Sequence, residues 1–381
     1  MDFALSEEQV AIRDMARDFG RERIAPFAQA WEAAGAIPRA VLREAGGLGF
    51  AAMYVPESMG GAGQAIARAS MISAASRRVS PAVASFISIH NMCAAMIARH
   101  GSETLRARTL HGAATMETIL AYCLTEPGSG SDAAALRTRA ERDGDGWRLT
   151  GTKAFISGGG VADLYVVMAR SVGDGPKGIS TFLVENGTPG LSFGAPERKM
   201  GWKAQPTAQV QLDECRVPAA NLLGIEGEGF TYAMQALDGG RLNIAAAALG
   251  GAQAALDIAL AYTGERRAFG KALNEFQALQ FRLADMETGL QAARTFLYQA
   301  AWKLDRGATD ATKHCAMAKR LVTDTAFEVA NDALQLLGGY GYLADYGIEK
   351  IVRDLRVHQI LEGTNEIMRV IVARGLVGRG N

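Results

Sequence analysis

The sequence predicts an α+β protein of three domains: a helical N-terminal domain (residues 1–117), a central β domain (118–226) and a helical C-terminal domain (227–381). Two changes in the hydrophobic period support this prediction. The spacing of apolar residues is helical at first, shortens to that of strands from about Ile119, and becomes helical again after Pro218. A chain of 381 residues with 49% hydrophobic content is large enough to bury more than one core.

The N-terminal domain begins with a clear helix signal. Ser6 and Gln9 have the spacing of a capping box, and four apolar residues follow at helical spacing. These four are Ile12, Met15, Ala16 and Phe19. Glycines within 46–49 and 60–63 separate the helices, and a second helical run covers 85–96.

The middle of the chain has the composition of β-strands. Five segments, each bounded by Gly, Pro, Asn or Asp, have this composition: ILAYCLT, GWRLTGTKAFIS, LYVVMAR, ISTFLVE and AQVQL. After this domain, stretches rich in Ala and Leu predict long helices from Phe230 to the end, with breaks at Gly264, Gly307 and residues 338–341.

Composition argues against several classes of protein. Lys plus Arg and Asp plus Glu both total 40, so no net charge favours nucleic acid or an anionic membrane. The four cysteines are scattered and the five histidines show no metal-ligand spacing, so we expect neither a metal site nor a disulfide framework. We also expect no membrane insertion, because no stretch approaches the length of a membrane span.

The first residues bear on the compartment. MDFALSEEQVAIRDMARDFG lacks the apolar core of a signal peptide and carries acidic residues early, unlike a transit peptide. Scattered cysteines are typical of a reducing compartment. We therefore expect a bacterial-type cytoplasmic protein, with a processed mitochondrial matrix protein as the alternative.

The segment HQILEGTNEIMR contains the strongest candidate for a catalytic group. Gly363 lets the backbone approach a ligand closely, and the next three residues can hydrogen-bond phosphate or ribityl oxygens. Glu362 follows two apolar residues, and an apolar wall raises the pKa of a carboxyl group toward that of a working base. The pattern predicts a catalytic base beside a bound cofactor.

A glycine-rich turn follows the first predicted strand. PGSGSDA superficially matches the dinucleotide-binding fingerprint through Gly128, Gly130 and Ala133, which would indicate a nicotinamide-dependent dehydrogenase. That fingerprint needs a strand–helix–strand unit, whereas here another strand follows after too short a helical segment. We therefore do not expect a nicotinamide site. The nicotinamide alternative predicts a colourless protein.

Seven motifs are distributed over nearly the whole chain. They are YCLTEPGSGSDA (122–133), KAFISGGG (153–160), RKMGWKAQPT (198–207), LDGGR (237–241), RRAFG (266–270), QLLGGYGY (335–342) and LEGTNEIMR (361–369). Together they resemble the acyl-CoA dehydrogenases, flavoproteins that oxidise acyl thioesters between the α and β carbons. The resemblance implies a β-barrel-like central domain, a C-terminal helical bundle, a bound FAD and a homotetramer.

The resemblance also implies a set of FAD-binding residues. Those near the flavin ring or the base are Tyr122, Cys123, Leu124, Thr125, Gly130, Ser131, Phe155, Ile156, Ser157, Thr364, Asn365 and Glu366. Those of the more distant half, reaching the FAD of a neighbouring subunit, are Arg266, Phe269, Gln277, Gln335, Leu336, Gly338 and Gly339. Among them, Arg266 can grip a pyrophosphate with a planar fork, and Phe155 offers the flavin a packing face.

The LDGGR motif distinguishes two locations of the base within the family. Branches such as isovaleryl-CoA dehydrogenase carry a glutamate just before this arginine and lack the one before G-T. Here the first position is Gly240 and Glu362 is present, so the resemblance implies that Glu362 is the base. The implied substrate-binding residues are Ser131, Asp238, Arg241 and Arg374. Arg241 is also expected to hold the loop bearing Glu362 through a charge-assisted bond.

The implied reaction is α,β-dehydrogenation. Glu362 removes the α-proton of the thioester while the β-hydrogen leaves as hydride to flavin N5. The motifs HNMCA, AFISG, LDGGRLNIA and VHQILEG resemble the branch that converts isobutyryl-CoA to methacrylyl-CoA in valine breakdown. A short straight-chain or 2-methyl-branched acyl-CoA is the alternative substrate, and an electron-transfer flavoprotein is the expected acceptor. The joint presence of Glu362 and the flavin motifs argues against a non-catalytic assembly subunit of the same fold.

Overall fold

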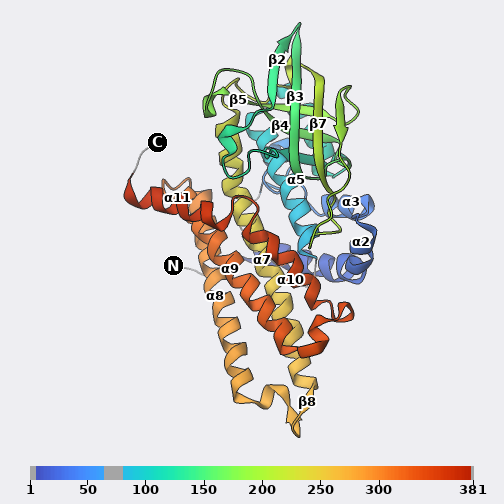
Figure 1. Cartoon of the computed structure of the whole chain (residues 1–381), viewed down its shortest axis with the longest axis vertical. Coiled ribbons are helices and arrows are strands. Elements are labelled where there is room, and N and C mark those ends of the chain that lie inside the picture. Colours follow the sequence, from blue (N-terminus) through green and yellow to red (C-terminus); the bar gives the residue numbers. More distant parts are fainter. Residues whose placement is uncertain (1–5, 64–79, 379–381) are drawn as a thin grey trace.

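The computed structural model describes residues 6–63 and 80–378. Figure 1 shows an elongated molecule with the β domain at one end and the C-terminal helices at the other. Two long helices, α5 (Pro81–His100) and α7 (Gly229–Glu265), connect these ends. The predicted fold class, helical then β then helical, is confirmed.

The N-terminal helices pack beside the β domain (Figure 1). They include α1 (Glu7–Phe19), α2 (Ala28–Ala34), α3 (Arg39–Gly47), α5 and α6 (Glu103–Ala114). The predicted capping box is present, since the Ser6 hydroxyl accepts from the Gln9 N–H at 3.2 Å and the Gln9 side chain accepts from the Ser6 N–H at 3.1 Å. His90 on α5 accepts from the Leu120 N–H at 3.1 Å, which joins this helix to the first strand.

The β domain is one seven-stranded sheet. Its strands are β1 (Leu120–Cys123), β2 (Arg139–Asp143), β3 (Gly146–Ser157), β4 (Leu164–Arg170), β5 (Ile179–Glu185), β6 (Leu191–Phe193) and β7 (Thr207–Pro218). The order is β1-β4-β2-β3-β7-β6, with β5 paired to β4. All five predicted segments form strands. Strands β2 and β6 were not predicted, because β2 (RAERD) is mostly charged and β6 has only three residues.

The connection between β1 and β2 shows whether the chain has the strand–helix–strand unit that a dinucleotide-binding fingerprint needs. Glu126 and Ser129 exchange two backbone hydrogen bonds of 3.0 and 3.1 Å, and a 3₁₀ turn at Ala133–Ala135 follows. This part of the described chain therefore contains no α-helix at which a pyrophosphate could bind. The expectation that this turn is not part of a strand–helix–strand unit is confirmed.

The C-terminal helices surround α7. They are α8 (Gln277–Asp305), α9 (Ala311–Leu336), α10 (Ile348–Arg356) and α11 (Asn365–Val377). Every residue of α7 from Gly240 to Leu256 is buried, and the many Ala and Gly residues there allow neighbouring helices to approach closely. The predicted breaks agree with the observed ends at Glu265, Asp305 and Leu336. A short hairpin between α7 and α8, formed by β8 (Arg267–Ala268) and β9 (Lys271–Ala272), was not predicted.

The statement that no stretch of the chain approaches the length of a membrane span was wrong. Helices α5 and α7 are each long and apolar enough to cross a membrane by length and composition. Sequence inspection underestimated them because occasional polar residues, such as Asn91 and Asn243, interrupt the apolar pattern. Most of each helix is buried inside the protein, where α5 and α7 form parts of its cores.

Candidate active site

Glu362 lies in a strained turn between α10 and α11. The backbone φ of Glu362 is +55°, a left-handed conformation that a residue with a side chain rarely adopts, and Gly363 follows with φ +86°. Such a conformation costs about 1–2 kcal/mol for a non-glycine residue. The Thr364 hydroxyl then caps α11 by accepting from the Ile367 N–H at 3.3 Å. Strain of this kind is typical of a functional position.

The carboxylate of Glu362 is directed toward α7. The Oε2 atom is buried without a hydrogen-bond partner in the described structure. A Cβ at Gly240 would lie 2.6 Å from this oxygen and 3.1 Å from Met92 Sδ, so the carboxylate occupies space that only glycine leaves open. Burial raises the pKa of Glu362 to about 7, against the opposing charges of Arg241 and Lys319. A carboxyl group with this pKa is suited to proton abstraction near neutral pH.

Arg241 and Asp238 form a buried ion pair beside this turn. Arg241 Nη1 donates to Asp238 Oδ1 at 2.6 Å, and the Thr312 hydroxyl donates to Asp238 Oδ2 at 2.6 Å. Arg241 Nε also donates to the backbone carbonyl of Glu362 at 3.5 Å. This contact is the one expected of an Arg241 that holds the loop bearing Glu362. Both oxygens of Asp238 are engaged within the protein.

A second cation contacts the same turn, and sequence inspection missed it. Lys319 on α9 is fully buried and donates to the Gly363 carbonyl and to Asn365 Oδ1, both at 2.8 Å. The Asn365 amide donates in turn to Asp324 at 2.7 Å. The side chain of Asn365, which was predicted to bind the cofactor, is thus engaged inside the protein. The signal for Lys319 was present, because apolar Cys315 and Val322 lie about one helical turn before and after it.

Phe155 presents a large apolar side chain on the surface of the β domain and has a left-handed backbone conformation. Its backbone φ is +57°, and the register between β3 and β7 shifts at this point, so the residue sits in a bulge. Its side chain is 68% exposed although it is large and apolar. The flanking Ala154 N–H donates to the Thr125 carbonyl at 2.8 Å, which joins the bulge to the end of β1. Ile156 is buried, whereas Ser157 is partly accessible.

The end of β1 presents mainly backbone to the same region. The side chains of Cys123 and Leu124 are buried in the interior, which agrees with the expected contacts through backbone groups. The Tyr122 hydroxyl is buried and has no hydrogen-bond partner in the described structure. Burial, and next the charge of Glu362, raise the pKa of Tyr122 well above its ordinary value. The Gly130–Ser131 segment is exposed.

A buried ion pair between Lys153 and Glu126 lies behind the Phe155 bulge and the end of β1. Lys153 Nζ donates to Glu126 Oε1 at 2.8 Å and to the Leu124 carbonyl at 3.1 Å. Glu126 also accepts from the N–H groups of Arg137 and Thr138, at 2.6 and 2.9 Å. The pair joins the residues preceding the Phe155 bulge to the loop after β1. The sequence offered no specific signal for it.

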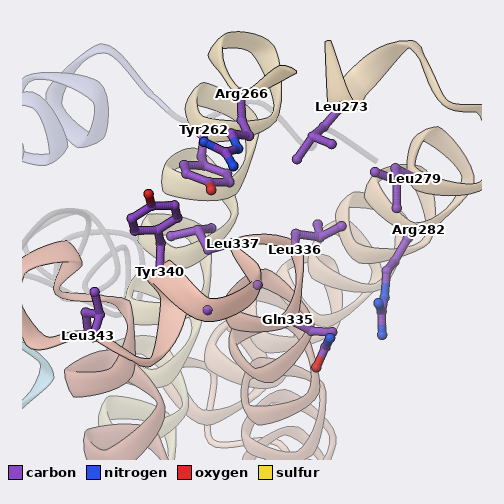
Figure 2. A pocket seen from close by; sticks show the side chains of 12 residues that line it. Tyr262, Arg266, Leu273, Leu279, Arg282, Gln335, Leu336, Leu337, Tyr340 and Leu343 are labelled. Atoms are coloured by element: carbon purple, nitrogen blue, oxygen red, sulfur yellow. The ribbon is translucent and has the colours of Figure 1, made fainter. Parts of the chain in front are cut away.

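A second group of predicted residues lies at the opposite end of the molecule. Arg266, Gln335, Gly338 and Gly339 line one groove of about 550 Å³. Figure 2 shows Arg266 and Gln335 in this groove with aromatic and leucine side chains. Its lining includes Tyr262, Leu273, Leu279, Arg282, Leu336, Leu337, Tyr340 and Leu343. The Arg266 guanidinium lies 5.5 Å from the centroid of the Tyr340 ring. A planar cation and glycine backbone in one groove are suited to a pyrophosphate and a flat base.

The other predicted residues are exposed, and several are distant from Glu362. Phe269 is 96% exposed at the hairpin tip, with φ +52°, and Gln277 is exposed at the start of α8. Arg374 and Glu366 are exposed on α11. Helix α7 separates the two groups of residues, since Arg241 and Glu265 are roughly 36 Å apart at the rise of an α-helix.

The arrangement around Phe155, Tyr122 and Glu362 fits a flavin. An apolar ring is exposed on a strained bulge, backbone groups at the end of β1 lie beside it, and two buried polar oxygens lack partners. Buried polar atoms without partners are rare in folded proteins and indicate a ligand or water at that place. The FAD implied by the sequence motifs is therefore compatible with the residues present.

Comparisons with known proteins agree with this arrangement. Models of the acyl-CoA dehydrogenase N-terminal, middle and C-terminal domains match residues 6–117, 121–215 and 227–377. The chain is 50% identical to a mitochondrial isobutyryl-CoA dehydrogenase from Dictyostelium discoideum over 373 residues, covering 98% of this chain and 90% of that protein.

Solved structures agree as well. Butyryl-CoA dehydrogenase from Megasphaera elsdenii has a TM-score of 0.95 and 37% identity, covering 99% of this chain and 100% of that one. PigA bound to FAD and proline has a TM-score of 0.96 and 30% identity, covering all of both chains. The chain belongs to the acyl-CoA dehydrogenase family of FAD-dependent oxidoreductases.

Proposed function

We propose that Glu362 is the base that removes the α-proton of an acyl-CoA substrate. The observation that supports this most directly is its buried, unpartnered Oε2 in a left-handed turn. A pKa of about 7 makes the carboxylate available near neutral pH and basic enough to accept a proton. Gly240 and the Met92 side chain lie beside this carboxylate, and burial together with its charge raises the pKa of the nearby Tyr122 hydroxyl.

The turn also supplies a group for the thioester carbonyl. In the described chain no hydrogen bond uses the Glu362 N–H, while the carbonyls of Glu362 and Gly363 are both held by cations. A free N–H on a fixed turn can donate to the thioester oxygen and stabilise the negative charge that develops there. Bound FAD would supply the acceptor for the β-hydrogen and its electron pair.

Two surfaces of the chain would hold that FAD. The flavin ring would pack on Phe155 and the backbone from Tyr122 to Thr125, with Ser157 as a hydrogen-bonding group and Ser131 at the junction with the substrate. The Arg266–Gln335 groove would bind the adenine half of a FAD held mainly by another subunit. This sharing is supported by the separation of roughly 36 Å between Arg241 and Glu265 along α7. The proposal requires an oligomer, and a homotetramer is the form we propose.

Isobutyryl-CoA is the substrate that we propose, and methacrylyl-CoA the product. The 50% identity to an isobutyryl-CoA dehydrogenase over nearly the whole chain supports this choice. The large Met92 side chain beside the base favours a short acyl group. Short straight-chain and 2-methyl-branched acyl-CoAs are the competing substrates, and one methylene changes selectivity by only about 1–3 kcal/mol. An electron-transfer flavoprotein is the proposed acceptor of the electrons.

Anaerobic flavin reduction tests the substrate. Purified holoenzyme is mixed with isobutyryl-CoA, butyryl-CoA or 2-methylbutyryl-CoA, and bleaching of the flavin band is followed in a stopped-flow instrument. We expect the largest ratio of reduction rate to half-saturating concentration with isobutyryl-CoA. A larger ratio for either competitor would contradict the proposed substrate and leave the reaction type in place.

A further inference from the structure

Helix α9 presents a row of polar side chains to the turn that carries the base. Thr323 lies about one helical turn after Lys319, and Asp324 is the next residue. Lys319 binds the Gly363 carbonyl and Asn365 Oδ1, each at 2.8 Å. The Asn365 amide binds Thr323 at 3.0 Å and Asp324 at 2.7 Å, and Gln359 donates to Asp324 at 2.8 Å. The row therefore contacts residues on both sides of Glu362.

The turn needs such support because its conformation is unfavourable. Glu362 and Gly363 are consecutive residues with φ of +55° and +86°, and only the second is a glycine. A strained backbone persists only where its surroundings determine it. The carbonyl of Glu362 contacts Arg241 from α7, and the carbonyl of Gly363 contacts Lys319 from α9. Of these two contacts, the one with Lys319 is the shorter, at 2.8 Å against 3.5 Å.

We propose that Lys319 is a positioning residue for the reaction: its buried ammonium group binds the carbonyl of Gly363, fixes the Glu362–Gly363 turn and places a positive charge next to the base. This inference rests on the proposed role of Glu362 as the base. Lys319 acts through the turn and through its charge, not by contact with the substrate.

The charges around the turn are consistent with this role. Burial lowers the pKa of Lys319 to about 7, and Glu362 is the first of the groups that oppose this decrease. The other groups are Asp324 on α9 and Glu366 on α11, which also favour the charged lysine, and Arg241 on α7, which disfavours it. Around Glu362 itself, Arg241 and Lys319 favour the carboxylate. Removing Lys319 therefore leaves Arg241 as the main positive charge that stabilises the Glu362 carboxylate.

The test compares Lys319→Met with a matched variant, Lys350→Met. Lys350 is also a buried lysine in an ion pair, with Asp354, but it contacts neither the turn nor Glu362. Three quantities are measured for each holoenzyme: the pH dependence of flavin reduction by isobutyryl-CoA, the amide hydrogen exchange of residues 360–364, and the thermal midpoint. Both variants are expected to lose stability. The thermal midpoint therefore shows whether the two losses are similar, and it does not test the proposal.

Lys319→Met is expected to shift the pH midpoint of reduction upward by about half a unit or more, because a favourable charge is removed from the carboxylate. Exchange at residues 360–364 should become faster, and the limiting rate should fall about 10- to 100-fold as the base loses its position. Lys350→Met should keep the wild-type pH midpoint and the wild-type exchange in this segment. Lys319→Met with a wild-type midpoint and wild-type exchange would overturn the inference.

Lys319→Gln provides the same test if the methionine variant does not fold. Glutamine retains an N–H donor for the Gly363 carbonyl but has no charge, so the pH midpoint should still shift upward while exchange stays closer to wild type. An unchanged midpoint would refute the electrostatic role. Glu362→Gln is measured in parallel: if that variant reduces its flavin normally, the proposed base is wrong, whereas its inactivity together with unchanged Lys319 variants refutes only the role of Lys319.

Discussion

Gly240→Ala should displace the base without unfolding the protein. A Cβ at this position would lie 2.6 Å from Glu362 Oε2, closer than real Cβ contacts, and 3.1 Å from Met92 Sδ. The methionine is flexible and can give way. The carboxylate must move by several tenths of an ångström, and a displacement approaching 1 Å can reduce a rate by about 100-fold. We therefore expect flavin reduction by acyl-CoA to slow about 10- to 100-fold.

Stability should change much less than activity. Alanine in a helix interior is favoured over glycine by about 1 kcal/mol, and overpacking a core costs about 1–3 kcal/mol, so the two effects partly cancel. Gly239→Ala is the matched control, because a Cβ there has no atom within 4 Å while the gain in helix propensity is the same. Stopped-flow flavin reduction and urea denaturation are measured for both. Equal reduction rates for Gly240→Ala and Gly239→Ala would refute the steric reasoning.

Three further predictions concern charge, cofactor and core. The pKa of Glu362 in the folded protein is about 7, above the ordinary value of 4.5. Ionisation of this carboxyl group therefore lowers the stability of the folded protein as the pH rises from 4.5 to about 7. Glu362→Gln should stabilise FAD-free protein by about 3 kcal/mol above pH 7 but not below pH 4, as measured by urea denaturation at both pH values. Phe155→Ala should weaken FAD binding about tenfold by the loss of aromatic packing. Because the Phe155 side chain is 68% exposed, the free energy of unfolding of the FAD-free protein should stay unchanged within about 0.5 kcal/mol. Fluorescence titration with FAD measures the affinity, and wild-type affinity would show that the ring does not contact the cofactor. Lys153→Met should cost about 3–5 kcal/mol because it leaves the Glu126 carboxylate buried without its cation, and a loss below about 1 kcal/mol by urea denaturation would mean that water compensates that charge.

The domain plan could be read from the sequence because periodicity and turn residues agree over long segments. Strands such as LYVVMAR and ISTFLVE are almost entirely apolar and coincide with β4 and β5. The breaks near Gly264 and Gly307 are local signals with a direct structural meaning. The segments that were missed lack these signals: β2 is charged, β6 is short, and the β8–β9 hairpin has two residues in each strand.

The site could be predicted in part. Glu362, Gly363 and Phe155 belong to local motifs, so their importance is visible in the chain. Their left-handed conformations are not visible, because the strain depends on supports that are distant in sequence. Lys319 is 43 residues from Glu362 by subtraction of their numbers, and Lys153 pairs with Glu126 across 27 residues. Only the fold brings such partners together, so the contact between Lys319 and Asn365 could not be predicted from the sequence.

The most direct test of Glu362 as the base is single-turnover flavin reduction by Glu362→Gln holoenzyme. The variant and the wild-type protein are loaded with FAD to the same content and mixed anaerobically with isobutyryl-CoA, and the flavin absorbance is followed. We predict that Glu362→Gln retains FAD and binds acyl-CoA but reduces its flavin several orders of magnitude more slowly. Reduction at the wild-type rate would show that another group removes the α-proton, and would contradict the proposed mechanism.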